Sequence, residues 1–375
     1  NAAACLSAGI TPFDGRATDS GNRLKSGTSA MSIPAPVRHL ASFAFAAGAG
    51  WAFAFLGVPL PWLLGPMLSV GVLSMAGLTL SMPRGARQTG QLLLGTGIGL
   101  NFTPAVAAFV VDHIAVMVIC ALASILFGLF SALYLRKVAK VDMATAYFAS
   151  VPGGVVEMAI QATKWGGEMA PVSLAQSMRI LCVVTTIPTT LTLIGAVGHS
   201  PFQVEKLPFD LQGFPVLIAL SLLFGGLMAW RRITNGWLLG PLAAGALVTV
   251  LDLHLSGMPR ELLNLSQVLI GTFIGLRYRR ELVLPLRRFL PHALLSTLVL
   301  VGLNILFGIG VAEVTGLPAA SMVLSVSPGG MAEMSITAAV LELGVPLIAA
   351  FHIIRIFLVI ALSGLIFRYI LSSKA

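Results

Sequence analysis

Residues 150–159 read SVPGGVVEMA, and they interrupt a long apolar run before placing a carboxylate at Glu157. Pro152 lacks a backbone N–H, and the adjacent pair Gly153 and Gly154 lowers helix stability further. Inside lipid, such a break is tolerated only where protein or a wet cavity satisfies the freed backbone groups. The stretch therefore predicts a broken helix at a binding site.

The same pattern returns at residues 325–334, which read SVSPGGMAEM. Pro328, Gly329, Gly330 and Glu333 each lie 176 positions after their counterparts in the first stretch. Two copies at one spacing indicate that the chain contains an internal duplication.

The composition is that of an integral membrane protein. Of the 375 residues, 57% are hydrophobic and only 10% are charged, and the mean hydropathy is +0.94. In a soluble domain about a quarter of residues would be charged. The net charge of +9 comes from basic residues between apolar segments, where they set membrane orientation, so no nucleic-acid partner is expected.

Beyond residue 38 the chain is a series of apolar segments, whereas residues 1–38 are polar and predicted to be disordered. About 20 residues are needed to cross the hydrocarbon of a bilayer. The expected segments are 40–57, 60–80, 88–109, 113–135, 142–163, 171–198, 213–230, 236–255, 262–277, 291–312, 318–341 and 345–370. We therefore predict two membrane repeats, 39–205 and 206–375.

Further motifs support the duplication. WLLGP at 62–66 recurs at 237–241, and QLLLGTGIGL at 91–100 recurs as QVLIGTFIGL at 267–276. Gln91 and Gln267 begin the latter pair of segments. Their glycines favour close helix packing, and we keep both glutamines as candidate site residues with packing as the simpler role.

The distribution of basic residues decides whether the repeats are parallel or inverted. If every segment crosses fully, eight basic residues lie outside against 13 inside, with Arg179 and Arg355 set aside as intramembrane. If each Pro-Gly-Gly segment enters and leaves on one side, only Lys206 and Arg260 lie outside, against 19 inside. The positive-inside tendency favours the second case. We expect an all-α polytopic protein of two inverted repeats, each with about five transmembrane helices plus a re-entrant or broken Pro-Gly-Gly helix.

Glu157 and Glu333 lie in the first turn after each break. A carboxylate there can stabilise its own helix start, bind a cation, or take up a proton that drives transport. Two equivalent ionisable groups within membrane segments favour a functional role over a purely structural one.

Arg179 and Arg355 form a second equivalent pair inside apolar segments. Each can form an ion pair with the glutamate of its own repeat or attract an anionic substrate, and the sequence leaves both open. Gln176 and His352 precede them by three residues and therefore share their helix faces.

The duplicated WLLGP and PGGxxEM signatures resemble those of the bacterial AbrB family of membrane proteins. The resemblance covers residues 40–370 and implies a duplicated membrane architecture in a bacterial inner membrane. Members are labelled ammonia monooxygenase or membrane regulator. The six scattered histidines offer no ligand spacing for a redox metal, and residues 1–38 are too short and Gly-rich for a DNA-binding module.

We expect an ion-coupled secondary carrier for a small, anionic organic solute, with its N-terminus in the cytoplasm. The chain contains no phosphate-binding loop for ATP, so coupling to H⁺ or Na⁺ without a cofactor is predicted. Membrane lipid and the solute are the expected partners, and a homo-oligomer is compatible with the pattern. The alternative is a sensor or scaffold that affects gene expression indirectly, and an enzyme is the least favoured reading.

Overall fold

The computed structural model describes residues 34–196, 207–253 and 255–371, and every regular element within them is a helix. The first part of the chain forms α2 (Ala35–Phe55), α3 (Pro61–Met75), α4 (Ala86–Gly99), α5 (Pro104–Asp112), α6 (Ile114–Ala139), α7 (Met143–Ser150), α8 (Val155–Lys164) and α9 (Met169–Leu193). The remainder forms α10 (Gly213–Trp230), α11 (Gly236–Val250), α12 (Arg260–Gly275), α13 (Arg280–Val283), α14 (Leu290–Thr315), α15 (Ala319–Val326), α16 (Met331–Val340) and α17 (Val345–Ile366). Short helical turns, η1 (Leu284–Leu286) and η2 (Phe367–Leu371), follow α13 and α17. The prediction of an all-α fold is confirmed.

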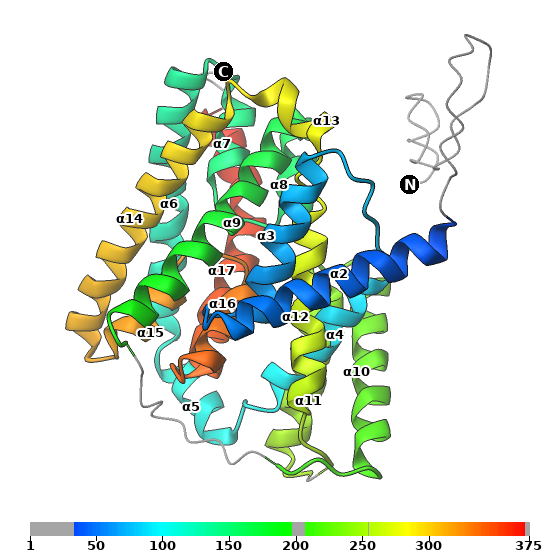
Figure 1. The fold of residues 1–375 in the computed structure, drawn as a ribbon. Coiled ribbons are helices and arrows are strands. Elements are labelled where there is room, and N and C mark those ends of the chain that lie inside the picture. The colour runs from blue at the N-terminus through cyan, green and yellow to red at the C-terminus, as the bar shows by residue number, and fades with distance from the viewer. Residues whose placement is uncertain (1–33, 197–206, 254, 372–375) are drawn as a thin grey trace. The chain divides into compact units, whose positions relative to one another are not determined.

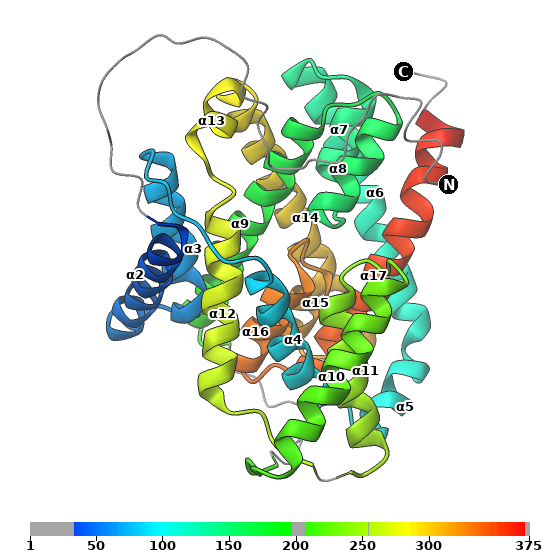
Figure 2. The same cartoon turned by 90° about the vertical axis from the view of Figure 1, so that its right-hand side faces the viewer.

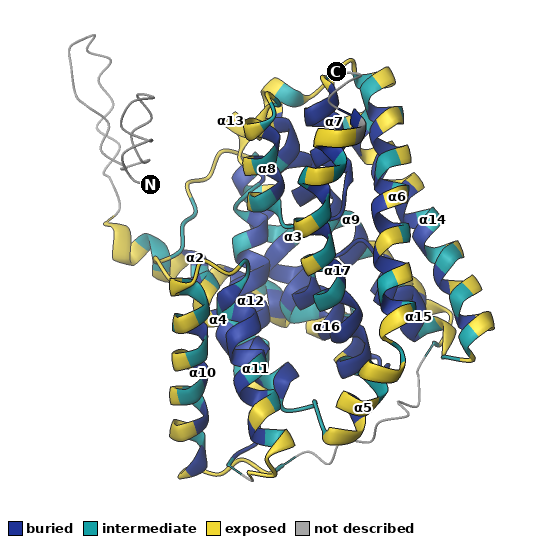
Figure 3. Ribbon diagram, turned by 180° about the vertical axis from the view of Figure 1, so that it is seen from behind, coloured by how far each residue is buried: buried dark blue, intermediate teal, exposed yellow. Residues whose placement is uncertain are grey.

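Several helices have the length and composition of membrane spans. Five qualify among the described residues: α6, α9, α10, α14 and the helix Val345–Tyr369 that contains α17. The outward faces of α6, α10 and α14 are exposed (Figure 3) and carry large apolar side chains such as Leu126, Leu223 and Leu298. Apolar residues on an outer face are what lipid contact requires. The chain is a polytopic membrane protein.

Fewer helices reach spanning length than the ten crossings that we predicted. The structure supports five of the described helices, or six if the bent pair α4 and α5 counts as one span. Helices α3 and α11 have 15 residues each, which is roughly 22 Å at the helical rise. Helix α3 is short because Leu60 before it and Gly77 after it have positive φ angles, which a right-handed helix does not contain.

The predicted span 88–109 is wrong as a continuous helix. Helices α4 and α5 are bent by 89° relative to one another. The bend arises because the Thr103 side chain caps the start of α5 and Pro104 occupies its first turn. A proline there starts a new helix and cannot continue the previous one.

The first helix begins earlier than we predicted, at Ala35 rather than near residue 39. Arg38, which we had assigned to a disordered segment, donates from Nε to Ser81 Oγ at 2.9 Å. Residues 1–33 and the predicted repeat boundary at 205/206 lie outside the described residues.

The helices pack as two groups (Figures 1 and 2). In the first, α3 packs on α2 and α12, and α11 packs on α4 and α10. In the second, α6 packs on α7, α14 and α17, while α9 contacts α8 and α14. Each group contains helices from both halves of the chain, so neither half forms a core of its own.

Glycines allow the closest helix crossings in the first group. A Cβ atom on Gly95 of α4 would lie 2.3 Å from the carbonyl oxygen of Leu238 in α11. A Cβ atom on Gly271 of α12 would lie 2.5 Å from that of Leu63 in α3. Backbones in contact exclude any larger residue, so the packing role that we predicted for these glycine-rich segments is confirmed.

The internal duplication seen in the sequence is also visible in the order of the helices. Helices α7 and α15 have equivalent bounds, as do α8 and α16, at the same spacing of 176 positions. In Figure 1, α6 rises from α5 to α7 while α14 descends from α13 to α15. Opposite directions are what inversion requires, and the inverted arrangement of whole repeats stays a prediction.

Candidate functional site

The site is organised by the two predicted breaks. Helix α7 ends at Ser150 and α8 begins at Val155, with extended backbone at Val151 and Gly154 between them. In the second copy α15 ends at Val326 and α16 begins at Met331, with extended backbone at Gly330. Both breaks therefore create a new helix N-terminus, where unpaired N–H groups and a partial positive charge are found.

Each broken helix returns to the end at which it entered. The backbone N–H of Glu168, after α8, donates to Thr145 Oγ1 at the start of α7 at 2.8 Å. In the second copy, Ser321 Oγ at the start of α15 donates to the carbonyl of Leu343, after α16, at 2.8 Å. These bonds close two hairpins, one in the upper and one in the lower part of Figure 1. Both broken segments are therefore helical hairpins, and their re-entrant position in the membrane stays a prediction.

Arg179 is buried in α9 and is bonded to backbone carbonyls. Its Nη1 donates to the carbonyls of Ser150 and Val151 at 3.3 and 3.4 Å. Its Nε donates to the carbonyl of Pro328 in the other hairpin at 3.0 Å, and its Nη2 donates to Gln176 Oε1. In the described part of the chain, these contacts take the place of the ion pair with Glu157 that we had considered.

Arg355 in α17 acts on the second hairpin in the same way. Its Nη2 donates to the carbonyl of Gly329 at 2.6 Å, and its Nη1 donates to the carbonyl of Ser327. Both arginines thus satisfy carbonyl groups that the broken helices leave without helical partners. Their first role is to hold the hairpin tips.

Gln176 and His352 complete this support at equivalent positions. Gln176 Nε2 donates to the carbonyl of Phe148 at 2.7 Å. His352 Nε2 lies 3.1 Å from the carbonyl of Leu324, which is the residue equivalent to Phe148. Each of them shares a helix face with its arginine, as predicted. From there it contacts the last helical turn before the break.

The two carboxylates fold back over the glycines that begin their helices. A Cβ atom on Gly154 would lie 1.9 Å from Glu157 Oε2, and one on Gly330 would lie 2.0 Å from Glu333 Oε2. Negative charge at a helix N-terminus is stabilising. Of the three roles that we considered for these glutamates, the geometry favours the helix-start role directly and leaves proton or cation binding open.

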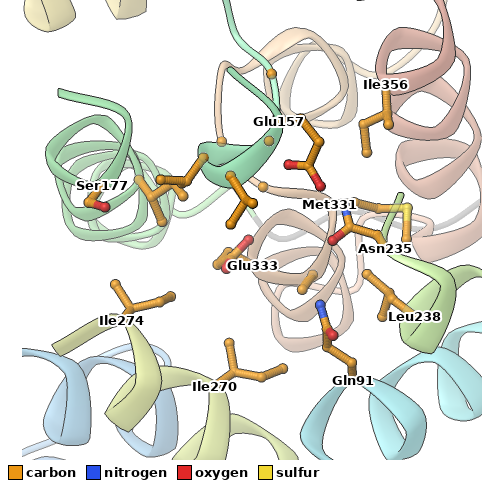
Figure 4. A pocket seen from close by; sticks show the side chains of 18 of the residues that line it. Gln91, Glu157, Ser177, Asn235, Leu238, Ile270, Ile274, Met331, Glu333 and Ile356 are labelled. Carbon is orange, nitrogen blue, oxygen red and sulfur yellow. The ribbon is translucent and has the colours of Figure 1, made fainter. Parts of the chain in front are cut away.

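A cavity of about 120 Å³ lies where the hairpins meet the first helix group. Figure 4 shows Glu157 and Glu333 on one wall, with Gln91, Ile270 and Ile274 on the wall opposite. Predicted residues that line it are Pro152, Gly153, Gly154, Glu157, Arg179, Gly329, Gly330, Glu333, Arg355 and Gln91. Pro328 and Gln267 are buried and are not among its lining residues. The structure therefore gathers most of the predicted set, from both halves, around one space.

The cavity also contains residues that we missed. Arg87, Phe273, Arg277 and Asn235 line it. Arg87 and Arg277 lie at the ends of apolar segments. In the sequence they therefore look like ordinary basic residues of the loops. Comparing the repeats does not reveal them either, because their counterparts, 176 positions away, are Leu263 and Asn101.

The described residues contain no group of three or more His, Cys, Asp or Glu side chains able to hold a metal ion. The cavity offers guanidinium, carboxylate and amide groups together with apolar walls. Fold and site together define an α-helical membrane protein with a polar cavity between two broken helices that fold as hairpins.

Comparison with known proteins names the family. The profile described as "Transition state regulatory protein AbrB" matches residues 62–371, so the chain belongs to the AbrB family. It is 27% identical over 343 residues to the "Uncharacterized protein YhjN" of Bacillus subtilis (strain 168), covering 85% of this chain and 89% of that protein. It is also 27% identical over 320 residues to the "Putative regulator AbrB" of Escherichia coli (strain K12), covering 84% and 92%. No solved structure matches the chain. The resemblance seen in the sequence is confirmed.

Proposed function

We propose that this protein is an ion-coupled secondary carrier of a small organic anion, and not an enzyme. The observation that carries the proposal is the meeting of both Pro-Gly-Gly hairpins, with both glutamates, at one cavity. Helix breaks that place opposed N-termini and freed carbonyls around a central site are a recurring architecture of secondary transporters. We place the protein in the bacterial inner membrane with its N-terminus in the cytoplasm.

The two helix groups provide a route to alternating access. The cavity is lined by α4 and α12 of the first group and by α8, α9, α16 and α17, which belong to the second. Movement of one group against the other would expose the cavity to each side of the membrane in turn. We propose that the hairpin tips, held by Arg179 and Arg355, move as part of the second group.

Glu157 and Glu333 are the proposed coupling residues. Glu333 is buried, with 7% of its surface exposed, whereas Glu157 is half-buried. A buried carboxylate is costly when ionised, so uptake of H⁺ or Na⁺ at Glu333 reduces that cost. This gives ion binding an energetic link to the state of the cavity.

The test is counterflow and gradient-driven uptake in proteoliposomes, with acetate, succinate, citrate and benzoate as solutes. We expect flux of at least one of them under an H⁺ or a Na⁺ gradient, and its loss in Glu157→Gln and Glu333→Gln. Glu281→Gln is the matched control, because Glu281 is exposed and outside the cavity. No flux of any of the four under either gradient would reject the carrier.

The alternative is a sensor that binds the same solute without moving it. The name of the Escherichia coli relative favours a regulatory role, and the exposed Arg279 and Arg280 at α13 offer a surface for a partner. Binding of a carboxylate to the purified protein without flux in proteoliposomes would favour this function. Any effect on gene expression would then be indirect.

A further inference from the structure

We propose that Arg87 and Arg277, positioned by Phe273, are the groups that bind the carboxylate of the solute. The inference rests on the proposed function of the cavity as a solute site. It also changes the expected anion-binding residues, because Arg179 and Arg355 are held by hydrogen bonds to the hairpin carbonyls.

The two arginines come from different helices and meet at one ring. Arg87 lies in the first turn of α4, and Arg277 lies two residues beyond the end of α12. The guanidinium carbon of each is 4.9 Å from the centroid of the Phe273 ring. Contact of a guanidinium with an aromatic face stabilises the charge and restricts its orientation. Phe273 thus contacts two positive charges at the cavity wall.

Both arginines retain donors for a ligand. The hydrogen bonds of the described residues use one N–H of Arg277, which donates to Ser177 Oγ at 3.3 Å, and none of Arg87. A guanidinium carries five N–H donors in a planar fork that matches a carboxylate. Two forks beside a cavity that both residues line therefore suit a carboxylate group better than a cation or a neutral solute.

The carboxylates of the cavity give this pair a link to the coupling ion. Arg277 interacts electrostatically with Glu157 and Glu333, and Arg87 interacts with Glu333. These attractions partly offset the positive charge that a bound anion would meet. Neutralising Glu333 with H⁺ or Na⁺ removes that competition, so ion uptake strengthens anion binding. Binding of the ion and binding of the solute therefore favour one another.

The site occurs once in the molecule and is built from both halves, with Arg87 in the first and Phe273 and Arg277 in the second. The positions equivalent to these three in the opposite repeat hold Leu263, Gly97 and Asn101. The anion site is therefore asymmetric although the hairpins are duplicated, and a single pair of substitutions should remove it.

The test is binding to the full-length protein in lipid nanodiscs, measured by calorimetry with acetate, succinate, citrate and benzoate. Succinamide, benzamide, phosphate and sulfate serve as comparison ligands. We expect saturable binding of a carboxylate, with affinity reduced about tenfold or more in Arg87→Gln and in Arg277→Gln. Glu333→Gln should bind the carboxylate more tightly than the unmodified protein. Arg84→Gln and Arg279→Gln are matched controls, since both residues are exposed and neither lines the cavity.

Other outcomes would overturn the inference. Equal binding of phosphate or sulfate would contradict carboxylate recognition, and unchanged affinity in both arginine variants would contradict the site. Absence of binding by all four carboxylates would do the same. Carboxylate binding that requires Arg87 and Arg277, without flux, would keep this site and reject the carrier. Flux that ignores both arginines but needs Glu333 would keep the carrier and reject this site.

Discussion

Arg179 and Arg355 occupy equivalent positions, but only Arg179 joins the two hairpins. Nε of Arg179 donates to the carbonyl of Pro328 at 3.0 Å, whereas Nε of Arg355 is buried without a hydrogen-bond partner. The equivalent acceptor for Arg355 would be the carbonyl of Pro152. One cross-hairpin bond is therefore made and its counterpart is not. In a carrier with inverted halves, the state open to the other side of the membrane would form the bond from Arg355 to Pro152 and lack the bond from Arg179 to Pro328.

This difference predicts unequal effects of removing the two arginines. Arg179→Met should lower stability more than Arg355→Met, because it also removes the bond that joins the two hairpins and leaves Gln176 Oε1 without this donor. Each buried carbonyl left unpaired costs about 1–3 kcal/mol. The measurement is the thermal unfolding midpoint in detergent, with Arg84→Met as the exposed control. Equal losses in the two variants would show that the bond to Pro328 contributes nothing.

Gly154 predicts a specific coupling with Glu157. Gly154→Ala places a methyl group where the carboxylate lies, so stability should fall by about 1–3 kcal/mol. Removing the carboxylate first should relieve most of the loss. A double-mutant cycle of Gly154→Ala with Glu157→Ala, followed by thermal unfolding, measures this interaction. Additive losses would mean that the glutamate does not fold back over the glycine.

The helix crossing at Gly95 predicts a large effect of one methyl group. Gly95→Ala should destabilise the protein by about 1–3 kcal/mol, because its Cβ meets the backbone of α11 and no side chain can move aside. Gly302→Ala is the control, since nothing lies within 4 Å of its added Cβ. The thermal unfolding midpoint distinguishes them. If the two variants are equally stable, α4 and α11 do not cross this closely.

The inverted arrangement predicts the side on which single cysteines are labelled. In a background with the native cysteines replaced, Lys164→Cys, Arg232→Cys and Arg279→Cys should be protected from an impermeant thiol reagent on intact cells. Arg260→Cys should be labelled, because Arg260 is one of the two basic residues assigned to the outside. Labelling of the first three before the membrane is opened would contradict the inversion and indicate helices that cross fully.

The sequence by itself determined the class of the protein and the position of both breaks. Composition excludes a soluble chain. Pro152 and Pro328, each followed by two glycines, break the helix at their own positions, because the reason is local. It also contained a local signal that we did not use: Thr103 followed by Pro104 starts a new helix, which bends the segment that we read as one span.

Tertiary structure decided which groups share the cavity. Arg87 and Arg277 lie far apart in the chain and meet only because α4 packs on α12, and Phe273 then holds both. Likewise Gln91 lines the cavity and Gln267 does not, although their segments are nearly identical in sequence. A repeat fixes what its two copies have in common. The packing of one copy against the other determines how they differ, and that depends on contacts between residues distant in the chain, which no local pattern contains.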